Sequence, residues 1–295
     1  KIQQPLLCNG TSPNKLGAGK IIFWLFAFAF FFGLTTQPAW ADDEPELRLA
    51  AHPRLWVTQA RLDRLGDYAR RNTLLWQALV REANPGFSIA ANALVYKVTE
   101  NPFYLDRALS LFGGQVGQDY REDRCYFYRL NGYDVTIGYD LLHDLISPDY
   151  RARIASWLMD LADQVWSPDP GRRRCTWAAY DAGSNYFHGF TSVIMAAAAV
   201  YEEEPIRAAY YLNLFRTGLN PLIRWYADEP ARGGVIPEGT SYDFAGMLAR
   251  TQMGFNRATG QDVSTGEIRT FVRDSALWRI HSTVPTKNAY YPLGA

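Results

Sequence analysis

The chain has 295 residues, of which 48% are hydrophobic, and its 30 basic side chains balance 30 acidic ones. Its length and apolar content are sufficient for a sizeable core. Because balanced charge provides no global field to collect a polyanion, nucleic acid is not an expected partner, and an anionic substrate would need a local basic patch.

Residues 1–41 have the pattern of a secretory signal peptide. Two lysines precede an apolar run at 21–34, which ends shortly before Ala39-Trp40-Ala41. The run is short for a spanning helix, and small residues occupy the positions that signal peptidase inspects. We expect cleavage after Ala41, a periplasmic or secreted protein, and no stable membrane insertion after cleavage. An uncleaved membrane anchor is the alternative.

Cleavage would leave 42–295 as one domain and would change its charge. The first segment holds three lysines and no acidic residue, so 30 basic residues minus 3 leaves 27 against 30 acidic ones, a net charge of about −3. The chain lacks an initial Met and ends after a polar stretch at Ala295. We therefore expect it to be a piece of a longer protein.

Two cysteines, Cys125 and Cys175, remain after the signal peptide is removed. Outside the cytoplasm a disulfide between them is expected to persist, and it would contribute about 4 kcal/mol on the chain-entropy model. Two buried free thiols are the alternative. Since neither cysteine has metal-ligand spacing and the four histidines are scattered, no metal or cofactor is expected.

From residue 52 onward the pattern predicts an all-α protein of about ten helices, without a hairpin of strands. Thr58 is a candidate cap for a helix that directs Leu62 and Leu65 inward, and 133–146 carries a comparable apolar stripe. Further helices are expected at 206–226 and after Ser147, where a serine, a proline and an acidic residue form a start signal. The apolar positions that follow this signal at helical spacing are Ile154, Leu158, Leu161 and Val165.

The segment 191–201 differs because it is apolar on all sides, which is typical of a helix enclosed by other helices. Its helix should begin near Ser184, so that Asn185 and His188 lie one turn apart on the same face. Alternating enclosed and half-exposed helices in antiparallel pairs predict an (α/α) toroid, complete or incomplete.

Three polar side chains indicate chemistry at a uronic acid: Asn185, His188 and, further along, Tyr242. Abstraction of the C5 proton of a uronate moves negative charge onto its carboxylate, which an amide or a protonated imidazole can stabilise. A neutral phenol can protonate the leaving glycosidic oxygen, so we assign Tyr242 the acid role before the base role. The structural alternatives are a helix cap for Asn185 and core positions for His188 and Tyr242.

A basic and aromatic segment leads into this turn. Arginine guanidinium groups bind carboxylates through paired hydrogen bonds, and aromatic rings stack on sugars. The segment 172–180 is therefore a candidate for binding an acidic polysaccharide. A solvated basic surface is the alternative. Glu238 precedes Tyr242 in a turn-forming run, where it is a candidate substrate contact or an organiser of the turn. The other substrate-binding candidates are Arg172, Arg173, Arg174, Trp177, Tyr180 and Arg232.

Several motifs together resemble the heparinase II/III and alginate lyase group: His52-Pro53-Arg54-Leu55-Trp56, the helix 138–145, the Asn185/His188 turn, and Pro237-Glu238-Gly239 followed by Tyr242. The resemblance implies a polysaccharide lyase with an α/α toroid followed by a β-sandwich domain, which is missing from this sequence. It also implies that Asn185 or His188 meets the uronate carboxylate while Tyr242 lies beside the scissile bond.

Two other functions remain open from the sequence. A glycoside hydrolase on the same architecture would need two carboxyl groups across the bond, for which Asp181 and Glu238 are the candidates. The second is a toroid that binds exopolysaccharide without catalysis.

Overall fold

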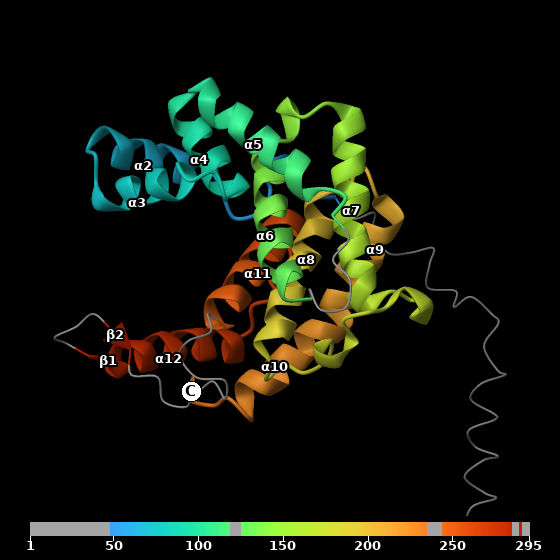
Figure 1. Cartoon of the computed structure of the whole chain (residues 1–295). Coiled ribbons are helices and arrows are strands. Elements are labelled where there is room, and N and C mark those ends of the chain that lie inside the picture. The colour runs from blue at the N-terminus through green and yellow to red at the C-terminus, as the bar shows by residue number, and fades with distance from the viewer. Residues whose placement is uncertain (1–47, 119–124, 235–243, 285–288, 291–295) are drawn as a thin grey trace, which may run out of the picture. The chain divides into compact units, whose positions relative to one another are not determined.

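The computed structural model describes residues 48–118, 125–234, 244–284 and 289–290, which all belong to one unit, 47–295 (Figure 1). The predicted all-α class is confirmed, because helices make up most of this part of the chain. The α-helices are α2 (Gln59–Arg70), α3 (Leu74–Ala83), α4 (Ile89–Thr99), α5 (Pro102–Gln115), α6 (Cys125–Leu142), α7 (Pro148–Trp166), α8 (Asn185–Ala199), α9 (Pro205–Leu214), α10 (Asn220–Asp228), α11 (Phe244–Thr259) and α12 (Gly266–Ser282).

Shorter elements join some of these helices. They are the 3₁₀ turns η2 (His143–Leu145), η3 (Pro170–Arg172) and η4 (Thr176–Ala178), and the π-helical segment η5 (Phe215–Leu219). Two strands, β1 (Thr283–Val284) and β2 (Ala289–Tyr290), pair antiparallel with Thr283 opposite Tyr290. The expectation of no strand hairpin therefore holds for the helical part but is wrong at this end of the chain.

Helix starts follow the local sequence. Thr58 accepts a hydrogen bond from the Arg61 amide at the start of α2, and Ser184 accepts one from the Tyr186 amide at the start of α8. Such caps satisfy amides that the helix itself leaves without partners. Ser147 precedes α7 as predicted, although its side chain makes no capping hydrogen bond, so Pro148 and Asp149 carry that start signal.

One predicted helix, 206–226, is interrupted. The structure divides it into α9, η5 and α10, and the Asn220 amide bonds the Phe215 carbonyl five residues earlier. Pro221 has no amide hydrogen for the carbonyl of Thr217, so the regular four-residue spacing cannot continue through this position. The wider π turn accommodates the proline without ending the helical path.

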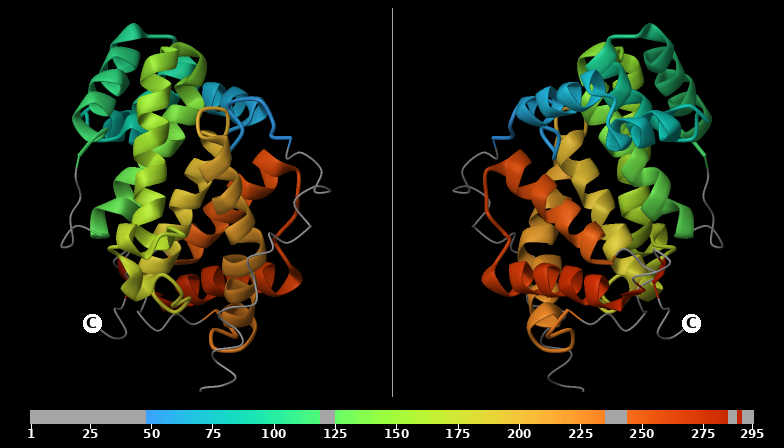
Figure 2. Two further views of the ribbon diagram at one scale, coloured as in Figure 1. Left: turned by 90° about the vertical axis from the view of Figure 1, so that its right-hand side faces the viewer. Right: turned by 90° about the vertical axis from the view of Figure 1, so that its left-hand side faces the viewer.

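Helix α8 is the centre of the core. Nearly all of its residues are buried, as the all-round apolar segment predicts, and it packs most extensively against α6 and α11 (Figures 1 and 2). Its other neighbours are α7, α9 and η5. Gly254 of α11 faces α8, and a Cβ added there would lie 2.5 Å from the sulfur of Met195, so that this side chain would have to shift.

Helices α6, α8 and α11 run parallel to one another. Gly132 of α6 lies beside Val193 of α8, and the His143 Nε2 after α6 lies 3.5 Å from Glu203 Oε1 after α8. The segment before Trp56 crosses the ends of α8 and α11, where the Arg54 guanidinium donates to the Ala198 carbonyl and the Ala50 amide donates to the Ala258 carbonyl. Parallel orientation gathers the starts of all three helices at one end.

The segment 52–55 is fastened by a buried carboxylate. Asp140 of α6 bonds His52 Nδ1 at 2.7 Å and accepts hydrogen bonds from the amides of Arg54 and Leu55. The His52 ring stacks on His143 with centroids 3.9 Å apart. The motif at 52–56 and the motif at 138–145 are therefore in contact, although they are far apart in the sequence. Asp140 satisfies backbone amides that would otherwise be buried without acceptors.

Candidate functional site

The candidate site lies at the start of α8. Asn185 is the first residue of this helix and is 3% exposed, while His188, one turn later, is fully buried. The sequence prediction that these two residues share one helical turn is therefore confirmed. Their burial differs from the open setting expected of two substrate-contacting side chains.

His188 is held by a backbone hydrogen bond. Its Nε2 lies 2.8 Å from the carbonyl oxygen of Ala182, and complete burial lowers the pKa of His188 to about 3. The ring is therefore neutral at ordinary pH, with Nε2 donating to the carbonyl. A neutral His188 favours a role in positioning the turn that leads into Asn185 over the expected role of a protonated imidazole beside a carboxylate.

The loop before α8 presents aromatic side chains next to this turn. Trp177 packs on Tyr186, with ring centroids 4.5 Å apart, yet 62% of its surface remains exposed. Tyr180 is 59% exposed on the same loop. Because Tyr186 follows Asn185 directly, the ring of Trp177 is fixed close to the first turn of α8. The arrangement offers an exposed aromatic face beside the first turn of α8.

A disulfide holds this loop to α6. Cys125, the first residue of α6, bonds Cys175, and their Cα atoms are 5.9 Å apart. The amides of Arg174 and Cys175 both donate to the Gln164 carbonyl near the end of α7. The backbone just before Trp177 is thus anchored to two helices.

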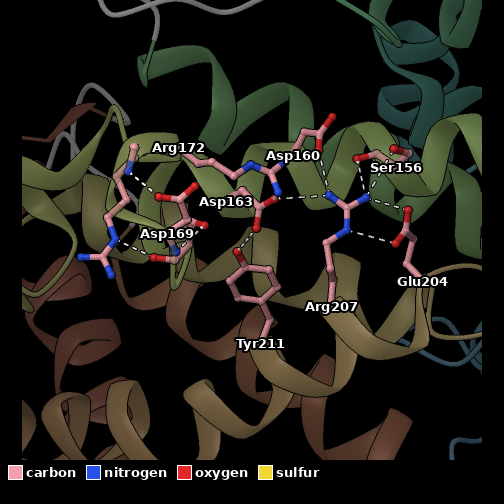
Figure 3. A network of polar contacts seen from close by, with 11 residues as sticks. Ser156, Asp160, Asp163, Asp169, Arg172, Glu204, Arg207 and Tyr211 are labelled. Carbon is pink, nitrogen blue, oxygen red and sulfur yellow. Dashed lines mark hydrogen bonds and ion pairs between the residues drawn. The ribbon is translucent and has the colours of Figure 1, made fainter.

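The three consecutive arginines of this loop have different environments. Arg172 is committed to an ion-pair network, with its guanidinium 2.6 Å from Asp163 and 3.0 Å from Asp160 (Figure 3). That Arg172 binds substrate stays a prediction, since 47% of its side chain remains exposed. Arg173 donates through Nε to the Ser167 carbonyl at 2.6 Å, whereas Arg174 is exposed and makes no ion pair with any other residue that the structure describes.

The network around Asp163 joins α7 to α9. Arg207 lies 2.6 Å from Glu204 and 2.7 Å from Asp160, and Tyr211 donates to Asp163 (Figure 3). Burial, followed by the hydrogen bond to Asp163, raises the pKa of Tyr211, so the phenol keeps its proton. The sequence pattern does not indicate this network, whose two aspartates are three residues apart on α7.

The remaining sequence candidates have the following positions. Arg232, 71% exposed, donates to the Asp228 carbonyl at the end of α10 and lies 3.6 Å from the carboxylate of the same residue. Asp181 accepts a hydrogen bond from the Gly183 amide, so its carboxylate organises a turn. Tyr242 and Glu238 lie outside the described residues, although α11 begins two residues after Tyr242.

Neither a metal cluster nor a membrane span is found in the described part of the chain. No group of three His, Cys, Asp or Glu side chains in these ranges is arranged to hold a metal ion. No helix there has both the length and the apolar character needed to cross a bilayer. Neither protein-family models nor curated protein sequences gave a match to the chain.

Proposed function

We propose that this chain is the α/α-toroid part of a polysaccharide lyase that cleaves uronic-acid-containing polysaccharide by β-elimination. One observation carries the proposal most strongly: an exposed aromatic face, Trp177, is fixed beside the helical turn that holds Asn185. A sugar ring stacked on this face would bring its substituents to the start of α8. The anchored loop limits the entropy that binding would cost.

The parallel helices support an anionic substrate at this end. Helix starts carry partial positive charge from their unpaired amides, and α6, α8 and α11 all begin here. Arg174 adds an exposed guanidinium on the loop. A carboxylate would therefore meet a favourable potential although the mature chain as a whole is slightly acidic.

Two residues, Asn185 and Tyr242, take a direct part in the proposed reaction. The C5–H bond of the uronate breaks and a base takes its proton, while the electron pair forms a C4–C5 double bond and expels the C4 oxygen. Asn185 donates from its amide to the carboxylate as negative charge gathers there. Tyr242 donates its phenolic proton to the departing oxygen. Neutral His188 positions the turn that carries Asn185.

The reaction type is tested with the secreted protein and uronate polymers of the alginate, heparin and chondroitin types. We expect ultraviolet absorbance from the unsaturated product to rise together with new chain ends. Reducing ends without this absorbance would identify a hydrolase and reject the lyase assignment. Binding without any cleavage would identify a glycan-binding protein.

Tyr242→Phe tests the proton donor, because it removes one oxygen and preserves the ring. We expect turnover to fall by about 100-fold or more while polymer binding is retained. Tyr210→Phe is the matched control, since it deletes a phenolic oxygen from a partly exposed ring on α9, away from the proposed site. Equal losses in both variants, or full turnover by Tyr242→Phe, would exclude this role for Tyr242.

A further inference from the structure

Two stacked imidazole rings lie where the segment 50–56, which we call the strap, meets the end of α6. The rings of His52 and His143 are 10° from parallel, with centroids 3.9 Å apart, and 6% and 14% of the two side chains are exposed. Tyr139 turns its ring edgewise to both. Burial raises the pKa of Tyr139, so this phenol stays neutral. The charge of the imidazole pair is therefore set by its ionic neighbours.

His52 has a carboxylate near each of its ring nitrogens. Asp140 Oδ1 lies 2.7 Å from Nδ1, and Glu202 Oε2 lies 3.7 Å from Nε2. A neutral imidazole donates from one nitrogen only, so its other nitrogen would turn a lone pair toward a carboxylate, whereas an imidazolium donates from both. Burial lowers the pKa of His52, but the contacts with Asp140 and Glu202 outweigh burial and raise it above the ordinary value.

His143 provides the face against which the His52 ring is held. Its Nδ1 lies 3.0 Å from Asp144, whose side chain is 80% exposed and therefore screened by solvent. Its Nε2 lies 3.5 Å from Glu203 Oε1, and the Arg151 Nε lies 3.1 Å from the same oxygen. The carboxylate of Glu203 is thus shared with a guanidinium, in contrast to the Asp140 carboxylate beside His52.

The described part of this cluster lacks one positive charge while both rings are neutral. Four carboxylates meet two guanidinium groups and one more distant ammonium group. A single proton held by the pair balances these charges. The carboxylates are Asp140, Asp144, Glu202 and Glu203, and the cations are Arg54, Arg151 and Lys97.

The carboxylates beside His52 also fasten the strap. Asp140 accepts hydrogen bonds from the amides of Arg54 and Leu55, and Glu202 lies 2.5 Å from the Arg54 guanidinium. Leu55 is fully buried, and Trp56 lines two hollows of about 260 and 360 Å³ on the neighbouring surface. A change of charge at the imidazole therefore acts on the same two groups that hold the strap in place.

We infer that His52, stacked on His143, is a proton-operated latch for the strap. With its proton, His52 links Asp140 to Glu202 and holds the strap on α6 and on the end of α8. Without the proton, the lone pair of Nε2 faces the Glu202 carboxylate, and the strap opens more often. Because the closed form binds the proton more tightly, it gains most below pH 6.5 and loses this gain as pH rises through the folded pKa. The latch requires no catalytic activity.

Hydrogen exchange of the Arg54 and Leu55 amides in the full chain measures how often the strap opens. After correction for the intrinsic effect of pH on exchange, their protection should fall about threefold or more between pH 6 and pH 8.5. The Glu229 amide, which bonds the Trp225 carbonyl at the end of α10, is the internal reference and should keep its protection. Constant protection of the strap, or an equal loss at Glu229, would overturn the latch.

Variants identify the groups responsible. His52→Gln should abolish the pH dependence of strap protection, and Glu202→Gln should reduce it because the second carboxylate is removed. Glu204→Gln is the matched control, since the Glu204 carboxylate pairs with Arg207. An undiminished pH dependence in His52→Gln, or the same reduction in Glu204→Gln as in Glu202→Gln, would contradict the proposal.

A second measurement on the wild type does not depend on the variants folding. The His52 ring is titrated by nuclear magnetic resonance, and its midpoint should lie above the ordinary value and coincide with the loss of strap protection. A midpoint at or below the ordinary value would overturn the latch, as would a midpoint clearly separated from the change in hydrogen exchange.

Discussion

At the scale of single residues, the two polar side chains at the start of α8 have separate roles. Asn185, 3% exposed, directly precedes Tyr186, which packs on the exposed ring of Trp177, whereas His188 points its Nε2 to the Ala182 carbonyl and is fully buried. Sequence spacing predicts their shared turn but not this difference. The exposure of each side chain depends on which helices surround the start of α8, and the local sequence around Asn185 and His188 does not specify those neighbours.

The burial of His188 predicts a pH dependence of stability. The folded protein binds a proton at His188 only near pH 3, whereas the unfolded chain does so near pH 6.5. Because the unfolded state binds protons first, the free energy of unfolding falls as pH drops through this window. Between pH 7.5 and 5, the wild type should lose about 2 kcal/mol more than His188→Gln, as measured by urea unfolding.

His52 provides a control of opposite sign. Burial lowers its pKa, but hydrogen bonds to Asp140 and Glu202 outweigh this effect and raise the pKa above the ordinary value. Its stabilising contribution is therefore present below pH 6.5 and is lost as pH rises through the folded pKa. His52→Gln should steepen the loss of stability in acid, and identical pH profiles for the two histidine variants and the wild type would contradict both assignments.

At the scale of elements, α7 and α9 are joined by a carboxylate rather than by apolar contacts alone. The Asp163 side chain is 5% exposed and meets Arg172, Arg207 and Tyr211, whereas half of the Asp160 side chain is exposed (Figure 3). Removing one partner of a buried ion pair leaves the other uncompensated. The contribution of each carboxylate to the free energy of unfolding should therefore increase with its burial.

Asp163→Asn is expected to lower the free energy of unfolding by about 3 kcal/mol, because two guanidinium groups lose a buried counter-charge. Asp160→Asn, the matched control one turn away, should cost less than about 1 kcal/mol since solvent screens its pairs. Urea denaturation at neutral pH measures both values. Similar losses of unfolding free energy for the two substitutions would show that burial does not determine how much each carboxylate stabilises the protein.

The disulfide acts on a different element, the loop before α8. Cys125 and Cys175 are separated by 50 residues, and opening the loop between them in Cys125→Ser/Cys175→Ser should cost about 4 kcal/mol on the chain-entropy model. A reducing agent should lower the wild-type urea midpoint to that of the double variant and leave the variant unchanged. Insensitivity of the wild type to reductant would contradict a stabilising role for the bond.

Local signals explain how far the elements could be predicted. The starts of α2, α7 and α8 and the buried face of α7 follow from Thr58, Pro148 and Ser184 and from helical spacing, because caps and periodicity act within a few residues. The π turn at 215–219 was missed, since its carbonyl pairing depends on both α9 and α10. The ion pairs of Arg172 could not be predicted either, because its partners on α7 are brought to it only by the folded loop.

At the scale of the whole molecule, charge is distributed unevenly in a chain whose basic and acidic residues balance. The first 41 residues carry three of the lysines and no acidic residue. Removal of this segment would make the remaining protein slightly acidic overall. An anionic ligand would then depend on local basic groups, such as the exposed Arg174, and not on the surface in general.

Processing of the N-terminal segment is testable directly. Expressed behind a start codon in a secreting bacterial host, the protein should lose residues 1–41 and begin at Asp42, because small residues precede this position. Intact-mass spectrometry identifies the new terminus. Ala41→Lys should block cleavage, and a wild type that retains the apolar run in the membrane fraction would support the anchor alternative.

The bond between Cys125 and Cys175 also sets an order of events. A reducing cytoplasm does not maintain such a bond. If the chain is exported, as its first 41 residues predict, the loop that carries Trp177 would gain its covalent link to α6 only after export. The precursor inside the cell would then hold this loop in an untethered form.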